Sequence, residues 1–506
     1  MLQIEHLTIT HTKDLRVIVS DLNLCLHAGD RAAIIGEEGN GKSTLLKLIY
    51  DPDSVQDYVQ FEGRVSPGTA HMGYLPQSLA PEEAAMSAAE FWDQGYPADP
   101  GQAAKLLKRL GLSREMAGDC RPMATLSGGE RVRLRLAKLL ALEPELLLLD
   151  EPTNDLDLQT LQWLEDFLLN STVPILFVSH DETLLERTAN VIVHLEALRR
   201  KNLPRCTVAR VGFRDYMETR DRRFLHQAQV SQWEHRAFQE KMDRFLRIRN
   251  KVEHQQSTIS RQDPHGGRLL KKKMHTLESM ERRFAQEKER LTQMPELEEA
   301  IFLRFPETAN VPRGKTVLDL ALPVLEAGGK TLARDIRLKL VGPEKVGIIG
   351  GNGCGKTTLL RAISEVMGSR SDFQVAYMPQ DYGDILDEEL DPVNALNPTG
   401  DPARATKIRQ YLGSVRFTTR EMCHPVGELS GGQKAKLFFL GMILDEAQVL
   451  LLDEPTRNFS PLSAPVIRKI LAQYGGAIIS VSHDRRFLEE VCQTIYALTP
   501  EGLRKL

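Results

Sequence analysis

The chain lacks the features of a membrane or secreted protein. None of its apolar runs approaches the ~20 residues that cross a bilayer, and the N-terminus has no basic start followed by an apolar stretch. Its six cysteines lie far apart and form no C-x-x-C pair, which argues against a disulfide framework or a cysteine metal site. A strong charge of one sign is also missing, because the net charge is only -4. We therefore expect a cytoplasmic protein with no membrane contact, folded from 506 residues into two or three domains.

What the chain does contain is an internal repeat. Four motifs occur twice: Tyr-x-Pro-Gln at 74–77 and 377–380, Leu-Ser-Gly-Gly at 126–129 and 429–432, Leu-Asp-Glu-Pro-Thr at 149–153 and 452–456, and Val-Ser-His-Asp at 178–181 and 481–484. The two copies of every motif are 303 residues apart, a coincidence that chance does not explain. The repeat predicts two domains of the same fold.

Each copy also contains a glycine-rich loop that follows an apolar strand and begins a helix, which is the pattern of a phosphate-binding loop. The lysines of the two loops, Lys42 and Lys356, are 314 residues apart. The first copy therefore has eleven more residues than the second between this loop and its glutamine. We expect these residues to form a surface insertion near Asp51 to Gly68.

The two loops are suited to bind ATP with Mg²⁺. Their glycines let backbone amides turn toward an anion, and the start of the following helix adds a partial positive charge. Lys42 and Lys356 can neutralise the β- and γ-phosphates, and Ser43 and Thr357 can offer a hydroxyl to Mg²⁺. The predicted cofactor-binding residues of the loops are Gly36, Gly39, Asn40, Gly41, Lys42, Ser43, Thr44, Gly350, Asn352, Gly353, Cys354, Gly355, Lys356, Thr357 and Thr358.

Two apolar runs, each typical of a buried parallel strand, end in a pair of carboxylates. Catalytic groups gather at such strand ends in open α/β sheets. Asp150 and Asp453 suit Mg²⁺, directly or through water, and Glu151 and Glu454 are placed to polarise an attacking water. A solvated strand edge is the alternative interpretation.

The spacing of the motifs resembles the ATP-binding-cassette (ABC) ATPase family over both halves of the chain. The Ser-Gly-Gly motif stands 23 residues before the acidic pair and the histidine 29 residues after its glutamate, in both copies. The resemblance implies an α/β fold with two ABC-type P-loop ATPase domains, in which the Ser-Gly-Gly motif of one domain covers the γ-phosphate bound by the other. Because both halves share one chain, the sandwich could close within a monomer.

The resemblance also assigns the residues of two ATP sites, with the histidines sensing or stabilising the γ-phosphate and the glutamines joining the catalytic group. The predicted first site combines Lys42, Ser43, Gln77, Asp150, Glu151 and His180 with Ser430, Gly431 and Gly432; the second combines Lys356, Thr357, Gln380, Asp453, Glu454 and His483 with Ser127, Gly128 and Gly129. For Ser127 and Ser430, a plain helix N-cap is the alternative.

A segment of different character joins the repeats. Apolar residues recur at helical spacing before and after a glycine- and proline-bearing stretch at 260–267, which should break the helix; they are Val230, Trp233, Ala237, Phe245, Ile248 and Val252, then Leu270, Met274, Leu277, Phe284 and Leu291. We expect an antiparallel α-helical hairpin linker with helices of about 25 to 35 residues. The predicted domains are 1–216, 217–296 and 297–506.

The linker concentrates positive charge near its turn. Between Lys241 and His275 ten Lys or Arg residues face three acidic ones, a local excess of +7 in a chain of net charge -4. Such segregation predicts a polyanion partner, with RNA the natural candidate, although a solvated charged helix is the alternative. The predicted RNA-binding residues are Arg247, Arg249, Lys251, Arg261, Arg268, Lys271, Lys272 and Lys273.

Tandem cassettes, a basic helical linker and no membrane part together resemble the ABC-F family. That resemblance implies a ribosome partner, which the protein would bind near the tRNA exit region, with the linker reaching ribosomal RNA and P-site tRNA toward the peptidyl-transferase centre. In the second copy, Ser460 replaces the acidic residue that ends the motif as Asp157 in the first. This form resembles the antibiotic-resistance branch, which protects ribosomes from drugs, and it predicts two unequal ATP sites. The alternatives are a housekeeping ABC-F translation factor, the ATPase subunit of a transporter, and a DNA-repair or chromosome-associated ABC protein.

Overall fold

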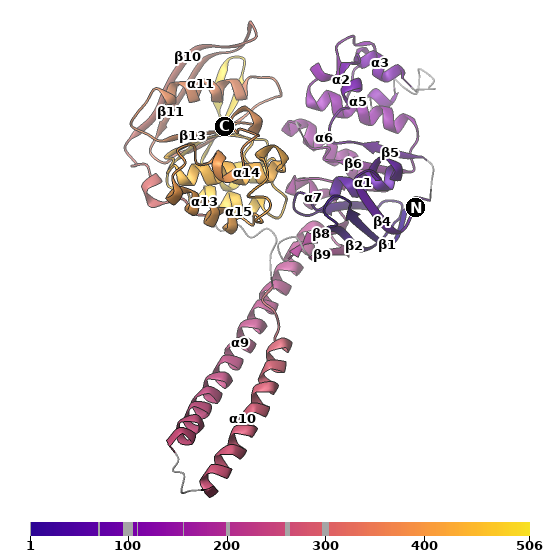
Figure 1. The fold of residues 1–506 in the computed structure, drawn as a ribbon. Coiled ribbons are helices and arrows are strands. Elements are labelled where there is room, and N and C mark those ends of the chain that lie inside the picture. The colour runs from indigo at the N-terminus through magenta and orange to yellow at the C-terminus, as the bar shows by residue number, and fades with distance from the viewer. Residues whose placement is uncertain are drawn as a thin grey trace. The chain divides into compact units, whose positions relative to one another are not determined.

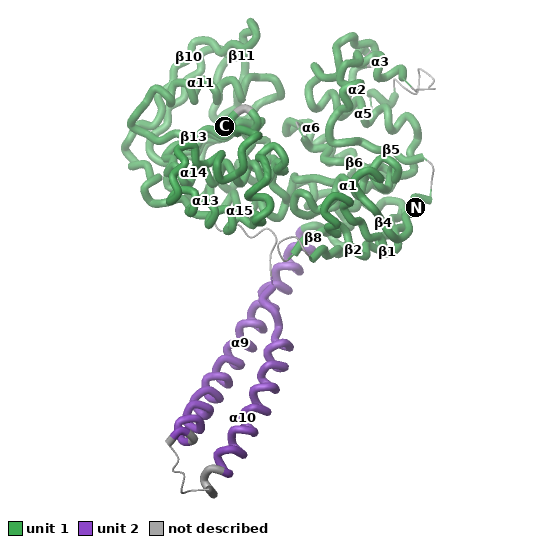
Figure 2. Tube along the Cα trace, in the orientation of Figure 1, with its two compact units in different colours: residues 1–213, 298–506 green, residues 214–297 purple. Residues whose placement is uncertain are grey.

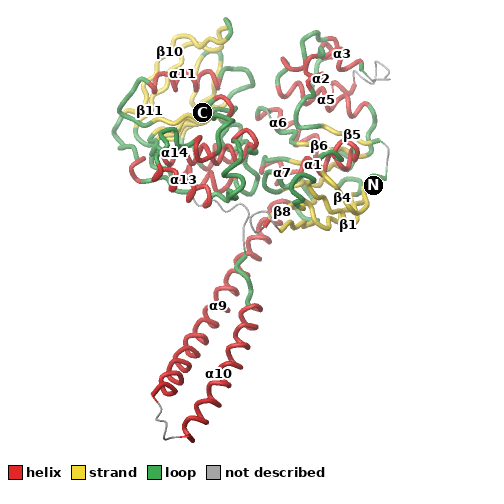
Figure 3. Tube along the Cα trace, in the orientation of Figure 1, coloured by secondary structure: helices red, strands yellow, loops and turns green. Residues whose placement is uncertain are grey.

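The computed structural model describes residues 2–68, 71–94, 105–108, 110–154, 156–198, 203–258, 264–295 and 303–506. The chain forms two compact units, one of Met1–Phe213 with Glu298–Leu506 and the other of Arg214–Leu297 (Figure 2). The first unit contains both halves of the repeat, each built on a six-stranded sheet, and the second is helical (Figure 3). The predicted α/β class with two cassettes and a helical linker is confirmed.

In the first cassette, the six-stranded sheet has the order β5-β6-β7-β3-β8-β9, and every neighbouring pair is parallel except β8 and β9. The interior strands are continuous apolar runs, as expected for a parallel sheet covered on both faces. The strands are β3 (Arg31–Ile35), β5 (Met72–Leu75), β6 (Leu146–Asp150), β7 (Ile175–Val178), β8 (Val191–Ala197) and β9 (Leu203–Ala209).

A separate antiparallel sheet of order β2-β1-β4 belongs to the same cassette (Figure 1). Its strands are β1 (Leu2–His11), β2 (Val17–Leu26) and β4 (Val59–Ser66). The eleven extra residues fall in the segment that contains β4, which pairs along β1 and keeps an exposed outer side. The predicted insertion is therefore an added edge strand.

The helices of the first cassette include the two that begin at the repeated motifs, α1 after the glycine-rich loop and α5 after the Ser-Gly-Gly motif. They are α1 (Lys42–Tyr50), α2 (Pro81–Ala85), α3 (Ala88–Asp93), α5 (Gly128–Ala141), α6 (Leu158–Leu169) and α7 (Glu182–Thr188), with short 3-10 helices η1 (Pro52–Val55), η2 (Arg114–Gly118) and η3 (Met123–Thr125). Helix α1 packs against β6 and β7.

The second cassette repeats this plan with sheet order β13-β14-β15-β12-β16-β17, and its separate antiparallel sheet has only the two strands β10 and β11. The strands are β10 (Thr316–Ala327), β11 (Lys330–Val341), β12 (Lys345–Ile349), β13 (Val375–Met378), β14 (Val449–Asp453), β15 (Ala477–Val481), β16 (Thr494–Thr499) and β17 (Gly502–Lys505). The helices are η4 (Glu307–Ala309), α11 (Lys356–Gly368), η5 (Tyr382–Asp384), α12 (Pro392–Ala395), α13 (Pro402–Ser414), η6 (Val426–Glu428), α14 (Gly431–Leu444), α15 (Ala464–Gln473) and α16 (Arg485–Glu490).

The second unit is a pair of helices, α9 (Phe213–Thr258) and α10 (Pro264–Arg290). They are antiparallel, because Ser231 in the first half of α9 donates to the carbonyl of Thr292 after α10, whereas Arg249 further along α9 pairs with Glu281 earlier in α10. An apolar cluster between them contains Phe245, Val252 and Leu277 with Met242, Leu270, Met274 and Phe284. The predicted hairpin is confirmed.

Three details of the hairpin prediction were wrong. Helix α9 has 46 residues and not 25 to 35, because nothing in its sequence breaks it before the turn. Helix α10 begins at Pro264, so the glycines at 266 and 267 lie inside its start, where proline is well tolerated at the first position. Trp233 and Ile248 are 73% and 55% exposed, outside the packed stripe. Within the described part of the chain, no helix is long and apolar enough to cross a membrane.

Candidate functional site

The lysine of the first glycine-rich loop is hydrogen-bonded to the backbone of its own loop. Gly39 and Gly41 have left-handed backbone angles, φ 77° and 82°, which let the chain turn sharply into α1. The Lys42 ammonium then donates to the carbonyls of Gly36, at 2.9 Å, and Glu37, at 3.1 Å. The ammonium and the amides at the start of α1 together form a cationic cradle of the kind that binds phosphate.

Two loop residues that the sequence assigned to ATP also hold the loop against β8. A Cβ added at Gly36 would lie 2.2 Å from the carbonyl oxygen of Leu195, so only glycine fits there. The buried Asn40 side chain donates to the same carbonyl at 3.0 Å. The Asn40 side chain therefore positions the loop and does not face the cavity described below.

The carboxylate of Asp150 meets the hydroxyl of Ser43, which donates to it at 3.0 Å. Burial raises the pKa of Asp150 to about 6, because the loss of hydration outweighs the hydrogen bond from Ser43 and the charges of Lys47 and Lys42. This hydroxyl–carboxylate pair lies at the end of β6 and the start of α1, and is suited to a divalent cation.

Glu151, the next residue, is surrounded by donors. Its carboxylate lies 2.9 Å from Nε2 of His180 and accepts from the amide of Gln77 at 2.9 Å and from Asn154 at 2.8 Å. Burial alone would raise its pKa, but the positive charge and hydrogen bond of His180 lower the pKa of Glu151 to about 2. Glu151 is therefore an ionised carboxylate at neutral pH.

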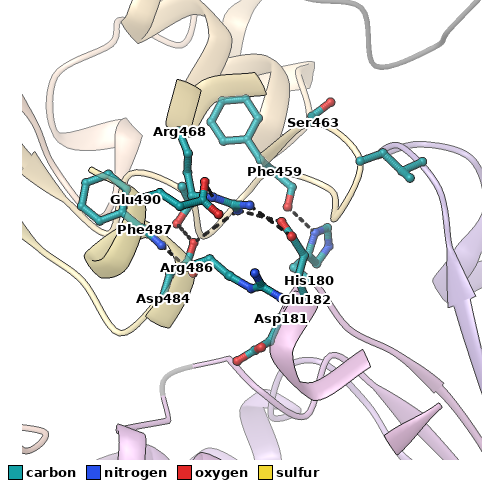
Figure 4. Close-up of polar contacts among 12 residues, drawn as sticks. His180, Asp181, Glu182, Phe459, Ser463, Arg468, Asp484, Arg486, Phe487 and Glu490 are labelled. Carbon is teal, nitrogen blue, oxygen red and sulfur yellow. Dashed lines mark hydrogen bonds and ion pairs between the residues drawn. The ribbon is translucent and has the colours of Figure 1, made fainter. Parts of the chain in front are cut away.

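His180 joins the two cassettes. Its Nδ1 lies 2.7 Å from the backbone carbonyl oxygen of Phe459, in the second cassette (Figure 4). Because both ring nitrogens face oxygens that only accept, both must carry a proton. Burial disfavours that charge, but Glu151 outweighs it and raises the pKa of His180.

The second loop has the same frame and different electrostatics. Lys356 donates to the carbonyls of Gly350 and Gly351, both at 2.9 Å. Burial raises the pKa of Glu454 to about 8, and burial also lowers the pKa of His483 to about 4. Nε2 of His483 and Oε1 of Glu454 are 3.8 Å apart, so the close ion pair of the first site is not reproduced.

Two cavities bring the loop of each cassette together with the opposite Ser-Gly-Gly motif. The first, of about 330 Å³, is lined by Glu38, Gly39, Gly41, Lys42, Ser43, Thr44, Gln77, Glu151, His180, Ser430, Gly431, Arg457 and Asn458. The second, of about 490 Å³, includes Asn352, Gly353, Gly355, Lys356, Thr357, Thr358, Gln380, Asp453, Glu454 and His483 with Gly128 of the first cassette. Eight predicted residues do not line their own cavity: Gly36, Asn40, Asp150, Gly432, Gly350, Cys354, Ser127 and Gly129.

The serines of the two motifs are helix N-caps as well. The hydroxyl of Ser127 accepts from the backbone of Glu130, whose side chain in turn accepts from the backbone N–H of Ser127. Ser430 forms the same reciprocal capping box with Gln433. The capping fixes where α5 and α14 begin, and thereby aims the N-terminal amides of each helix at the cavity of the other cassette.

The sequence interpretation missed the contacts of Glu37 and Glu38. The buried Glu37 carboxylate accepts from the hydroxyls of Ser460 and Ser463 in the second cassette, both at 2.5 Å, and lies 3.6 Å from Lys436. Burial opposes ionisation, but these partners lower the pKa of Glu37. Glu38 accepts from the backbone N–H of Gly432. Two adjacent carboxylates in a phosphate loop were the visible signal.

A second contact between the cassettes is ionic. Arg468 of α15 is only 3% exposed and donates to both carboxylate oxygens of Glu182 in α7, at 2.7 and 3.1 Å (Figure 4). Its remaining nitrogen donates to Glu490 at 2.9 Å. Arg486 pairs with Glu186 at 2.6 Å, and Arg485 pairs with Glu165. The helices α7 and α16 thus bear complementary charges where they meet.

The residues present fit ATP with Mg²⁺. Among the side chains that the structure describes, the buried Oδ2 of Asp453 has no hydrogen-bond partner, which suits an atom meant for a cation. No group of three or more His, Cys, Asp or Glu residues that could by itself hold a metal ion occurs in the described ranges. Mg²⁺ needs only one or two carboxylates when phosphates and waters complete its shell.

The predicted RNA-binding residues are mostly exposed. Arg247, Lys251, Arg268 and Lys271 to Lys273 face solvent at the ends of α9 and α10 that flank the turn. Arg249 is engaged with Glu253 and Glu281, at 2.8 and 3.0 Å, and so also ties the hairpin together. Arg261 lies outside the described residues.

The family model described as "ABC transporter" matches residues 19–154 and 333–457. The chain is 30% identical to the ribosome protection protein VmlR of Bacillus subtilis (97% of this chain, 85% of that protein) and 30% identical to the tylosin resistance ATP-binding protein TlrC of Streptomyces fradiae (94% of both). It is also 30% identical to ABC transporter F family member 2 of Arabidopsis thaliana, over 79% of this chain and 56% of that protein.

Proposed function

Because the chain belongs to the ABC-F family of ATPases, whose cassettes bind and hydrolyse ATP, we propose that it is an ATP-driven ribosome-binding protein that protects the ribosome from antibiotics. The observation that carries this proposal is the helical hairpin between the cassettes, with its exposed basic end. The names of VmlR, a ribosome protection protein, and TlrC, a tylosin resistance protein, support the role in resistance.

The ATP sites work as a clamp. In the first site Lys42 binds the phosphates, Glu151 polarises the attacking water, Gln77 and His180 orient that water and the γ-phosphate, and the start of α14 closes over them. In the second site the same roles belong to Lys356, Glu454, Gln380 and His483, and the start of α5 closes over them. When bound, Mg²⁺ neutralises charge on the phosphates, and it would be held by Ser43 and Asp150 in the first site and by Thr357 and Asp453 in the second. Binding favours closure, and loss of the γ-phosphate removes the contact that closure depends on.

The hairpin supplies the contact with RNA. Lys271, Lys272 and Lys273 are consecutive exposed lysines on α10, and Arg247 and Lys251 are exposed on α9 at the same end. Their charges would neutralise backbone phosphates and release counterions. Such contacts read shape and backbone, as suits ribosomal RNA and the P-site tRNA near the peptidyl-transferase centre. This role places the protein in the cytoplasm, acting as a monomer whose own two cassettes form the sandwich.

The test is co-sedimentation with bacterial ribosomes in the presence of ATP, using the Glu151→Gln/Glu454→Gln variant to keep the clamp closed. We expect this variant to retain ATP binding, to stop turnover and to stay on the ribosome through a sucrose cushion. Rapid release of the variant, or near-normal turnover, would contradict the clamp mechanism.

A charge-reversal variant tests the hairpin. Replacing Lys271, Lys272 and Lys273 by Glu should abolish most ribosome binding and flatten its salt dependence. The matched control replaces Lys330, Arg337 and Lys339, three exposed cations of β11, and makes the same change in net charge. Equal ribosome binding by both variants would show that the three hairpin lysines do not contribute to the interaction.

A drug-susceptibility panel separates resistance from a housekeeping role. Expressed in a susceptible bacterium, the wild-type protein should raise the inhibitory concentration of drugs that bind near the peptidyl-transferase centre, and the lysine-reversed variant should not. Ribosome binding without any change in susceptibility would identify a housekeeping translation factor instead.

A further inference from the structure

The first phosphate loop carries two negative charges where a phosphate is expected. Its residues Glu37 and Glu38 correspond to Gly351 and Asn352 of the second loop, which are uncharged. A carboxylate beside a triphosphate opposes binding, since like charges ~4 Å apart repel by a few kcal/mol at an effective dielectric constant of ~20. Both carboxylates are instead used in contacts with the opposite cassette.

Glu38 binds the start of α14. Its Oε2 accepts from the backbone N–H of Gly432 at 2.5 Å, and a Cβ added at Gly432 would lie 2.6 Å from its Oε1. Gly432 is the second residue of a helix capped by Ser430, so its N–H has no partner within the helix. The partial positive charge of the helix start further favours a carboxylate.

The same cavity holds the cation that would otherwise face a phosphate. Glu38 and Lys42 both line the first cavity, and the charge of Glu38 contributes to the raised pKa of His180. The Glu38 carboxylate thus contacts a helix N-terminus in a cavity that an ammonium and an imidazolium also line, and these are the groups that the proposed clamp uses for the γ-phosphate.

Glu37 keeps this arrangement in place. It accepts from Ser460 and Ser463 and lies 3.6 Å from Lys436, all in the second cassette. The first cassette has Asp157 at the position that matches Ser460. An aspartate at 460 would set a second carboxylate against Glu37, so the serine and the glutamate fit each other. Ser460, which departs from the family pattern, therefore contacts a matching residue of the first loop, Glu37.

We propose that Glu38 is a built-in substitute for the γ-phosphate, whose carboxylate closes the first site against α14 until ATP displaces it. The inference rests on the proposed clamp and adds a difference between its two sites. The second site binds ATP without such competition, whereas the first binds ATP only by exchanging one anion for another. The first site can then be closed without ATP, so a closed conformation does not show that ATP is bound there.

The test replaces Glu38 by Asn, the residue of the second loop, in a Lys356→Ala background that weakens ATP binding at the second site. Titration with a fluorescent ATP analogue should show binding on the order of tenfold tighter than in the parent, because removal of one like charge near a phosphate is worth about 1.4 kcal/mol or more. Glu62→Asn, at an exposed position of β4, is the control and should leave the affinity unchanged.

Hydrogen exchange gives a readout that does not depend on hydrolysis. Without nucleotide, the amide of Gly432 should exchange about tenfold faster in Glu38→Asn than in the parent, and ATP should restore protection in both. Affinity within twofold of the parent, weaker binding, or unchanged exchange at Gly432 would each overturn the proposal. If Glu38→Asn does not fold, Glu38→Gln keeps the side-chain length and carries the same expectations for affinity. If the protein fails to sediment with ribosomes, the affinity and exchange measurements still test the role of Glu38. If it does sediment but Glu38→Asn changes neither ATP affinity nor exchange at Gly432, only the role of Glu38 is contradicted.

Discussion

Glu151 Oε1 lies 2.9 Å from Nε2 of His180, and this ion pair has no equivalent at the second site, where the matching glutamate and histidine atoms are 3.8 Å apart. In the first site the pair is charged on both sides, because each partner shifts the pKa of the other toward the ionised form. In the second site burial favours the neutral form of both groups. Two sites made from the same motifs therefore differ in charge.

The single glutamine variants should lose different amounts of ATPase activity. Removal of a positioned general base costs ~10²–10⁴ at the affected site, so total turnover falls to the share of the other site. We expect Glu151→Gln to remove the larger share, since Glu151 is ionised and already bonded to Gln77 and His180. The rate of phosphate release, measured for both variants, tests this. Equal losses of ATPase activity in the two variants would argue against unequal sites.

Substitution of Arg468 should destabilise the protein more than any exposed arginine does. Arg468→Met leaves the carboxylate of Glu182, only 12% exposed, without its cation, which costs about 3–5 kcal/mol in the free energy of unfolding. The control is Arg337→Met, whose partner Asp335 is exposed, and it should change stability by less than about 0.5 kcal/mol. Denaturant midpoints measure both.

A second variant separates the ion pair from the burial of charge. Replacing Arg468 and Glu182 together by Met should recover much of the stability, because no buried charge is then left unpaired. A double variant as unstable as Arg468→Met alone would mean that packing, and not charge, explains the loss.

The hairpin core should depend on Leu277. Leu277 is 6% exposed and belongs to the cluster with Phe245 and Val252, so Leu277→Ala should cost about 2–5 kcal/mol. Met280, on the same helix, is 42% exposed, and Met280→Ala should cost less than about 0.5 kcal/mol. Hydrogen exchange of α10 amides reports the local opening, and similar protection in both variants would show that the cluster does not stabilise the hairpin.

The cysteines should react with iodoacetamide in a defined order. Burial raises the pKa of the Cys492 thiol to about 12, so at pH 8 only ~10⁻⁴ of it is thiolate, whereas Cys120 and Cys423 are exposed. We expect Cys492 to be alkylated at least ~100-fold more slowly than these two, with a rate that rises about tenfold per pH unit. Mass spectrometry of the time course measures this; comparable rates would mean that the segment after α16 opens readily.

The sequence by itself determined the two cassettes, their glycine loops, the acidic strand ends and the presence of a hairpin. These features are local: a glycine loop between an apolar strand and a helix, and a helical stripe broken near proline, are written in neighbouring residues. Even so, the stripe did not distinguish Trp233 and Ile248, which face solvent, from Phe245, which is buried, because a long helix offers apolar residues to more than one face. The RNA-binding assignments and the catalytic roles remain predictions.

Only the tertiary structure decided what the acidic residues of the first loop do. Glu38 and Gly432 are 394 residues apart in the chain, and Glu37 and Ser460 are 423 apart. Contacts over such separations depend on how the two cassettes meet, and no local pattern encodes that. The unequal charge of the two glutamate–histidine pairs has the same origin. Burial and the distance between the paired atoms, 2.9 Å in the first site and 3.8 Å in the second, set each pKa, and identical motifs can receive different surroundings.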